Sequence, residues 1–340
     1  MILAGDIGGT KTSLGLFERQ DGAWIRRSSA SLRSADYAGL EDALAAFLGS
    51  RAGEIEAASF GVAGPVLHNR ARTPNLAWEE IDAERVARAL GCGPVTLLND
   101  LVATALGVGS VAPDATVTLQ EGEPDPSAAV AVIAAGTGLG MSALLPGPSG
   151  PVPMPSEGGH TDFAPRDARQ ERLLHALRAE LGGRVSVERV VSGPGIWAIY
   201  RFLRDHEGLV EEGRTRSALD AISPPLLPER AAAVISESAA HSALCRETLR
   251  LFCSAYGAAA GDLALVTLAR GGLVIAGGIA PRNLARMTDG TFLEAMLDKG
   301  RYRSILASIP VKIVMDQEVA LLGAARHAAD TLKQDTQKNQ

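Results

Sequence analysis

Two glycine-rich segments in the sequence have the composition of loops that bind a polyphosphate. The first is Gly5-Asp6-Ile7-Gly8-Gly9-Thr10 and the second is Gly136-Thr137-Gly138-Leu139-Gly140; each joins two apolar segments with the pattern of β-strands. Glycines let a backbone approach a phosphate closely, and successive backbone N–H groups supply the donors that the phosphate needs. Loops that join strand to strand differ from the Rossmann and P-loop motifs, which lead from a strand into a helix.

Asp6 gives the first loop a carboxylate that could hold Mg²⁺ through water. Magnesium keeps several waters and binds proteins through one or two carboxylates together with substrate phosphates. Taken alone, either loop is a plain hairpin turn. The recurrence of the pattern after about 130 residues, with a third glycine pair at Gly277-Gly278, favours a phosphate site instead.

Two further pairs of polar residues could act on a hydroxyl group. Asn99 and Asp100 end a strand-like segment, and α/β sheets tend to place ligands at the carboxyl ends of their strands; the alternative for Asp100 is a helix N-cap. Glu157 and His160 are separated by two glycines, which disfavour a helix, and the spacing is not H-E-x-x-H, so we reject zinc. A carboxylate and an imidazole on a loop suit a sugar, whose hydroxyls both donate and accept.

The composition is that of an ordinary globular protein. A chain of 340 residues suggests two lobes, and a formal charge of −6 offers no general basic field for a nucleic-acid partner. Cys92, Cys245 and Cys253 are too widely spaced for a disulfide framework or a C-x-x-C zinc site. The sequence shows neither a signal peptide nor an uninterrupted apolar run that spans a bilayer, so we expect a cytoplasmic protein without a membrane partner.

Hydrophobic spacing predicts alternating strands and helices, which is typical of α/β layers. The two glycine loops, one in each half, indicate a duplicated lobe with a cleft between the copies. Helical spacing extends over 40–48, 81–90, 170–181, 196–205, 230–266 and 320–332. We expect a small α/β lobe over 1–109 that is rejoined by a C-terminal helix at 318–332, a large α/β lobe over 110–317, and a flexible tail over 333–340.

Five motifs in this order resemble those of the bacterial glucokinases, which belong to the superfamily of hexokinase, actin and Hsp70. The resemblance covers roughly residues 1 to 330, and five motifs in one order are specific even though each is weak to moderate alone. The motifs are Gly5-Asp-Ile-Gly-Gly-Thr10, Leu97-Leu-Asn-Asp100, Gly136-Thr-Gly-Leu-Gly140, Glu157-Gly-Gly-His160 and Ala276-Gly-Gly-Ile279.

The resemblance implies an actin-like ATPase fold with two lobes, each on a mixed sheet of the RNase H type, and an active site in the interlobe cleft. It implies ATP-dependent phosphorylation of the 6-hydroxyl of a hexose, most simply glucose, with Mg²⁺ as cofactor. Asp100 would be the base facing that hydroxyl. Sugar ligands would be Asn99, Asp100, Glu157, His160, Glu188 and Asn75, and ATP ligands Gly5, Asp6, Ile7, Gly8, Gly9, Thr10, Gly136, Thr137, Gly138, Gly277 and Gly278.

Some residues leave alternatives open. Glu188 could instead be a helix-surface charge paired with Arg184 or Arg189, and Trp78 is expected to be a packing residue. Lys11 follows the first loop where many close glucokinases have Asn, whereas the absence of a C-x-C-G-x-x-G-C motif favours the zinc-free group. Relatives suggest a homodimer. Alternative functions are a kinase of another hexose, a glucokinase that uses polyphosphate, and a non-catalytic sugar-sensing regulator on the same fold.

Overall fold

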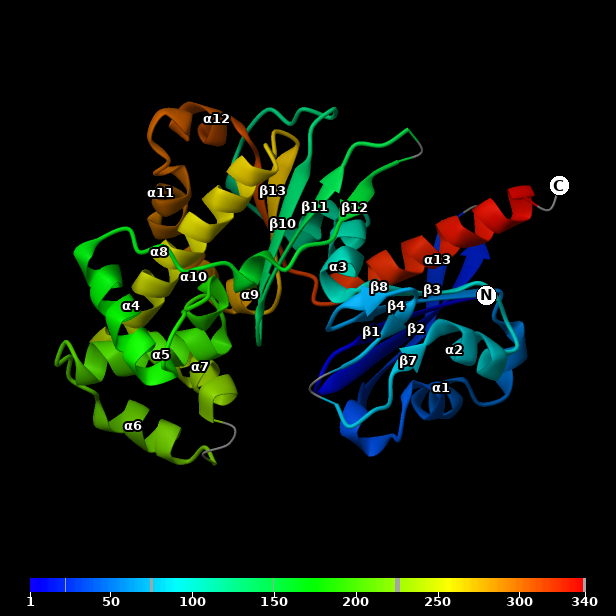
Figure 1. The fold of residues 1–340 in the computed structure, drawn as a ribbon, viewed down its shortest axis with the longest axis horizontal. Helices are drawn as coiled ribbons and strands as arrows, with labels where there is room; N and C mark the ends of the chain where they lie inside the picture. The colour runs from blue at the N-terminus through cyan, green and yellow to red at the C-terminus, as the bar shows by residue number, and fades with distance from the viewer. Residues whose placement is uncertain (22, 74–75, 149, 224–226, 339–340) are drawn as a thin grey trace. The chain divides into compact units, whose positions relative to one another are not determined.

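A computed structural model describes residues 1–340 except 22, 74–75, 149, 224–226 and 339–340 (Figure 1). The chain forms two compact units, each built on a sheet of mixed strand orientation. The first unit comprises residues 1–115, 153–155 and 316–340, and the second comprises 116–152 and 156–315.

The first unit is built on five strands in the order β3-β2-β1-β4-β8. β1 (Ile2–Ile7) is antiparallel to β2 (Lys11–Gln20), which pairs with β3 (Ala23–Arg33). On its other side β1 is parallel to β4 (Ala57–Val62), and β4 is parallel to β8 (Val95–Asn99). The carboxyl ends of β1, β4 and β8 therefore lie along one edge of the sheet.

Alternate residues of β1 pack against different helices, as the period of two in a strand requires. Leu3 and Ile7 share a buried cluster with residues of α1 (Leu40–Leu48) and α2 (Ala83–Leu90). Ile2 and Ala4 share another with residues of α13 (Val319–Lys338), which crosses the same strands in Figure 1.

α13 also packs closely on α3 (Asp100–Val108). A Cβ atom on Gly323 would lie 1.7 Å from the carbonyl oxygen of Ala103, so the two helix backbones are in direct contact at this point. This contact fixes the position of α3, whose first residue is Asp100. A small sheet of β5 (Val66–Leu67), β6 (Arg70–Ala71) and β7 (Ile81–Asp82) completes the strands of the first unit.

The second unit repeats the strand succession of the first. β10 (Val130–Ala135) is antiparallel to β11 (Leu139–Leu145) and parallel to β13 (Gly272–Ala276), which is parallel to β14 (Val311–Val314). This succession of one antiparallel and two parallel pairings matches that of β2, β1, β4 and β8, and it agrees with the duplication that the glycine loops predicted. The outer strands are β12 (Val152–Met154) and β9 (Thr116–Gln120).

The helix α8 (Ala243–Val266) lies in the core of the second unit. Residues 243–267 are long and apolar enough to cross a membrane by length and composition alone, but 72% of the apolar window is buried inside the protein. The other helices of this unit are α4 (Ala168–Leu181), α5 (Gly193–Asp205), α6 (Gly213–Asp220), α7 (Leu227–Ser238), α9 (Ile279–Arg282), α10 (Leu284–Met287), α11 (Thr291–Leu297) and α12 (Arg303–Ser308).

Three of the predicted helix boundaries are wrong. The stretch 230–266 is two helices, because the Ser242 hydroxyl accepts the N–H of Cys245 and caps a separate α8. Ile81 belongs to β7, and the Asp82 carboxylate caps α2 by accepting the N–H groups of Glu84 and Arg85. α13 continues to Lys338, so most of the segment 333–340, expected to be a flexible tail, is helical. Lys333, Gln334 and Asp335 have exposed side chains, which a solvated helix accommodates.

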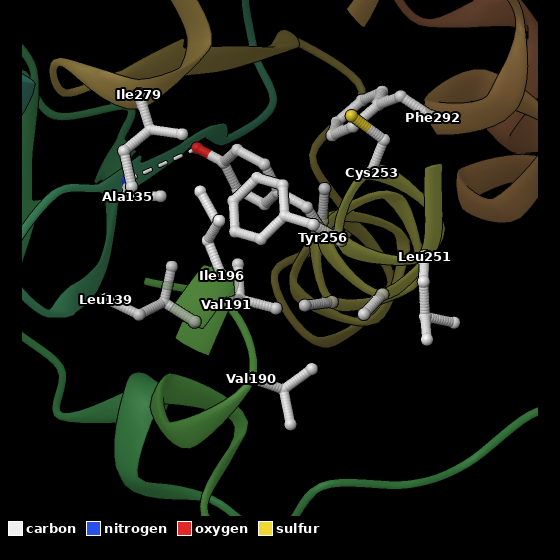
Figure 2. Close-up of a cluster of buried hydrophobic side chains, with 14 of the residues drawn as sticks. Ala135, Leu139, Val190, Val191, Ile196, Leu251, Cys253, Tyr256, Ile279 and Phe292 are labelled. Carbon is white, nitrogen blue, oxygen red and sulfur yellow. Dashed lines mark hydrogen bonds between the residues drawn. The ribbon is translucent and has the colours of Figure 1, made fainter. Parts of the chain in front are cut away.

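Tyr256 joins α8 to the end of β10 (Figure 2). Its hydroxyl accepts the N–H of Ala135 at 3.3 Å, and its ring packs against Phe252 and edge-on against Phe292.

We expect Tyr256→Phe to lower the free energy of unfolding by about 1–3 kcal/mol, because it leaves a buried N–H without this acceptor. Urea unfolding followed by circular dichroism measures the change. Tyr302→Phe, at an exposed position, is the control and should stay within about 0.5 kcal/mol of wild type. An equal effect of both substitutions would contradict the prediction.

Candidate active site

The first glycine loop is a tight turn between β1 and β2. The Gly8 N–H donates to the carbonyl of Lys11 at 2.9 Å and closes the turn. Ser34 also stabilises this loop, because its hydroxyl donates to the Gly8 carbonyl at 3.1 Å and its N–H donates to the Thr10 carbonyl at 3.1 Å. Sequence reasoning missed Ser34, because only the β2–β3 pairing brings it to a loop more than twenty residues earlier.

Asp6 is the penultimate residue of β1. Burial raises the pKa of its carboxyl to about 6, although the nearby Lys11 ammonium opposes the shift. Among the residues that the structure describes, no group of three or more His, Cys, Asp and Glu side chains could hold a metal ion. A single carboxylate of this kind fits an ion held mainly by water and phosphate oxygens, as Mg²⁺ is, and does not fit a cage of protein ligands.

Asn99 and Asp100 lie at the junction of β8 and α3. The Asn99 side-chain oxygen accepts the N–H groups of Leu101 and Val102 at 2.9 and 3.4 Å, so Asn99 is the N-cap of α3. The alternative that Asp100 is merely the N-cap is therefore wrong; it is the first helical residue, where the helix dipole favours a carboxylate. Asn99 also donates from its side-chain amide to the Gly64 carbonyl, which leaves one N–H of that amide for a ligand.

The strand register gathers these groups at one edge of the first unit. Ile7 is opposite Val62, and Val62 is opposite Asn99. A Cβ atom on Gly61 would lie 3.6 Å from the Cα of Asp100, so the start of α3 lies directly against β4. The first loop, Asp6, Asn99 and Asp100 are thus neighbours along this edge. The predicted ligand Asn75 lies outside the described residues.

Trp78, three residues after Asn75, is a packing residue as the sequence predicted. It is buried in the cluster beneath β1, and its indole N–H donates to the carbonyl of Tyr37 at 2.9 Å. The indole therefore serves the core of the first unit and is not a platform for a sugar ring.

The second glycine loop is the turn between β10 and β11. The Gly136 N–H donates to the Gly138 carbonyl at 2.8 Å, whereas the N–H groups of Thr137 and Gly138 make no hydrogen bond within the described residues. Two adjacent backbone donors are therefore available to an anion. The third glycine pair lies against this turn: Gly277 has a φ of +82°, and a Cβ atom there would lie 2.5 Å from the carbonyl oxygen of Ala135.

The predicted sugar ligands of the second unit surround the start of β11. Glu157 precedes the short turn Gly158–His160, and His160 is its last residue. Both side chains are exposed and make no hydrogen bond or ion pair within the described part of the chain. The turn packs on β11, since a Cβ atom on Gly159 would lie 1.9 Å from the carbonyl oxygen of Leu139.

Glu188 lies in the turn Val187–Arg189, and its carboxylate accepts the N–H of Leu139 at 3.0 Å. The alternative of a surface charge paired with Arg184 or Arg189 is wrong: within the described residues neither arginine forms an ion pair with Glu188, and Arg184 instead pairs with Asp162 and donates to the His160 carbonyl. All the predicted site residues of the second unit therefore come from segments that meet at the ends of β10 and β13 and the start of β11.

The glucokinase family model matches residues 3–331 of this chain. The chain belongs to the glucokinase family. It is 41% identical to glucokinases of Nostoc sp. and Nostoc punctiforme, each alignment covering 97% of this chain and 99% of the relative. Because the matches span nearly the full length of both chains, the predicted family is confirmed and the chain is a glucokinase-family enzyme.

Solved structures give the same result. The crystal structure of a glucokinase from an Antarctic psychrotroph matches with a TM-score of 0.81 at 30% identity, covering 97% of this chain and 98% of that one. A glucokinase from Balamuthia mandrillaris, solved in complex with glucose, matches with a TM-score of 0.75 at 20% identity, covering 96% of this chain and 93% of that one. The second likeness concerns the fold alone. The mixed α/β sugar-kinase fold predicted from the sequence is thereby confirmed.

The raised pKa of Asp6 leads to a prediction about stability. Because the pKa is about 6 in the folded state and near 3.8 in the unfolded chain, the folded state holds the proton more tightly. Raising the pH through this window therefore costs stability. We expect Asp6→Asn to unfold at higher urea concentration than wild type, with a gain that grows from about pH 4 to about pH 6 and then stays constant.

The measurement is urea unfolding across this pH range in EDTA, without nucleotide. Asp114→Asn, in an exposed turn of the same unit, is the control for the loss of one negative charge. An Asp6→Asn variant that is less stable than wild type at pH 8 would show that the carboxylate has a stabilising partner in the folded state.

Proposed function

We propose that this protein transfers the γ-phosphoryl group of ATP to the 6-hydroxyl of glucose and releases glucose 6-phosphate and ADP. The observation that carries the proposal is the position of Asp100 in a chain of the glucokinase family. Asp100 is the first residue of α3, at the sheet edge that also holds the first glycine loop. The preceding residue, Asn99, is the N-cap of α3.

The two glycine loops are the proposed phosphate sites. The backbone donors of Thr137 and Gly138 and the turn closed by Gly8 can cradle anionic oxygens. Lys11, directly after the first loop, adds a positive charge. Asp6 would hold Mg²⁺ through water, and the ion would neutralise charge on the phosphates. Gly277 and Gly278, against the end of β10, are proposed to lie near the adenosine.

Asp100 is the proposed base. Phosphoryl transfer asks the protein mainly for positioning and for stabilisation of charge, with the attacking oxygen in line. A carboxylate within hydrogen-bond reach of the 6-hydroxyl orients it and accepts its proton as the oxygen bonds to phosphorus. Asn99 can contribute one N–H to a neighbouring hydroxyl, and both lone pairs of its amide oxygen are already used in the cap.

The remaining sugar hydroxyls are assigned to the second unit. Glu157 and His160 present side chains without protein partners among the described residues, as a ligand-binding pair requires. Glu188 is the third proposed ligand. Carboxylates accept hydrogen bonds from sugar hydroxyls, and an imidazole can donate or accept. These three side chains can therefore bind several hydroxyls of one pyranose. Asn75 stays a prediction from the family resemblance.

The choice of glucose and ATP is supported by the relatives. The Balamuthia mandrillaris structure contains glucose, and a glucokinase of Streptomyces griseus, similar in fold at a TM-score of 0.62 and 21% identity, was solved with glucose and AMPPNP. A magnesium requirement, membership of the zinc-free group, a cytoplasmic location and a homodimer remain predictions. Another hexose or polyphosphate as substrate is the alternative.

A coupled assay of ADP release tests the proposed function. Glucose, mannose, fructose and N-acetylglucosamine are compared with buffer alone, each with ATP and with polyphosphate as donor, where polyphosphate turnover is followed by hexose phosphate. We expect ATP with glucose to give the highest kcat/KM. No hexose-dependent turnover with either donor would refute the proposal.

Substitution of Asp100 tests the base. We expect Asp100→Ala to lower kcat on the order of 10²–10⁴-fold while glucose binding largely survives, because the carboxylate acts mainly on the reacting hydroxyl. Steady-state kinetics and calorimetric titration with glucose measure the two effects. Asp114→Ala, an exposed carboxylate of the same unit, should match wild type. Turnover by Asp100→Ala near the wild-type rate would show that another group orients the hydroxyl.

A further inference from the structure

Glu188 contacts the backbone of the second glycine loop at the point where β11 begins. Leu139 is the first residue of β11, and its N–H donates to Oε2 of Glu188 at 3.0 Å. The bond joins residues 49 positions apart, so it is a tertiary contact and not part of the hairpin itself. It leaves the N–H groups of Thr137 and Gly138, immediately before it, without protein partners in the described chain.

The same carboxylate explains why residue 138 is glycine. A Cβ atom on Gly138 would lie 2.5 Å from Oε2 and 3.3 Å from Cδ of Glu188, which is closer than packed atoms approach. Gly138 does not have a positive φ, so its backbone alone would accept another residue. A Cβ atom on Gly136, by contrast, would meet nothing within 4 Å. A residue larger than glycine at 138 would therefore have to displace the Glu188 carboxylate from the Leu139 N–H.

The segment that carries Glu188 is itself fixed on both sides. The Glu188 carbonyl accepts the Ser192 hydroxyl at 2.7 Å, and the next residue, Gly193, donates its N–H to the Gly136 carbonyl at 2.8 Å. On the other side, the Val187 N–H donates to the carbonyl of Thr161, next to His160, at 2.9 Å. Glu188 therefore lies between the glycine loop and the turn that carries Glu157 and His160.

We propose that Glu188 is a positioning residue for the second phosphate loop in addition to its proposed contact with the sugar. Oε2 holds the Leu139 peptide and so orients the two preceding N–H groups toward the phosphates of ATP, while Oε1 is the oxygen proposed to accept from the sugar. The proposal rests on the proposed function, because it takes that loop as a phosphate site. One side chain then serves both substrates, and its loss weakens ATP binding even when no sugar is present.

The experiment compares binding of a non-hydrolysable ATP analogue with Mg²⁺, without sugar, to wild type, Glu188→Ala and Glu188→Gln. Glu157→Ala is the matched control, since it removes a proposed sugar ligand whose side chain makes no hydrogen bond to residues 136–139 in the described structure. We expect Glu188→Ala to weaken analogue binding about tenfold or more, the usual effect of losing a hydrogen bond to a charged group, and Glu157→Ala to leave it unchanged.

Glu188→Gln separates the two roles of the side chain. Its amide oxygen can still accept the Leu139 N–H, so we expect analogue binding to recover to within a few-fold of wild type while KM for glucose stays raised. A side chain needed only for folding would move both constants together with the unfolding midpoint, which is measured for each variant.

A double-mutant cycle with Gly138→Ala tests the contact directly. In the wild-type background the added methyl group collides with the carboxylate and should weaken analogue binding about tenfold; in the Glu188→Ala background it should have little further effect. Additive effects, or analogue binding by Glu188→Ala equal to that of Glu157→Ala, would overturn the proposal. If wild type itself showed no hexose-dependent turnover, the proposed function would fail instead, and the two failures are distinguishable.

Discussion

The parallel pairing of three strands in each unit is the constraint on which the site depends. β1, β4 and β8 run in one direction with Ile7, Val62 and Asn99 in register, and β10, β13 and β14 repeat the arrangement. Each loop that follows these strands therefore emerges at one edge of its sheet. A shift of one residue between β4 and β8 would turn the side chains of β8 to the opposite face and displace Asp100 from the loop after β1.

Close contacts between backbones require glycine at two positions near the site. Gly323 lets α13 approach Ala103 of α3, and Gly277 lets the loop after β13 lie against the end of β10. Any side chain at these points would separate the backbones that position the polar groups. Asp6 differs from these glycines in that its burial is unfavourable: burial disfavours the ionised carboxyl and raises its pKa, and the Lys11 ammonium offsets part of this effect.

The sequence predicted the family, the duplicated α/β units and the loop positions because these depend on local patterns. Gly5–Thr10 and Gly136–Gly140 are recognisable from composition alone, and β1, β10 and α1 follow from hydrophobic spacing. What it missed depends on contacts between distant segments. Ser34 reaches the first loop only through the β2–β3 register, and the role of Glu188 depends on a backbone N–H 49 residues away. The break between α7 and α8 was missed because the sequence alone does not distinguish Ser242 from other polar residues. Only the hydrogen bond from the Cys245 N–H to its hydroxyl identifies it as a helix cap.

The repeated topology also places an aspartate after each of two corresponding strands. Asp100 follows β8, and Asp316 occupies the corresponding place shortly after β14. The Asp316 carboxylate accepts the N–H of Glu318 and closes a turn just before α13. At the end of β8 the residue that contacts the helix start is Asn99, whose amide oxygen accepts two helix N–H groups and caps α3. Asn99 therefore supplies the cap of α3, and Asp100, whose Oδ1 also accepts the Leu101 N–H at 2.9 Å, is the first helical residue and the group proposed to act on the sugar hydroxyl.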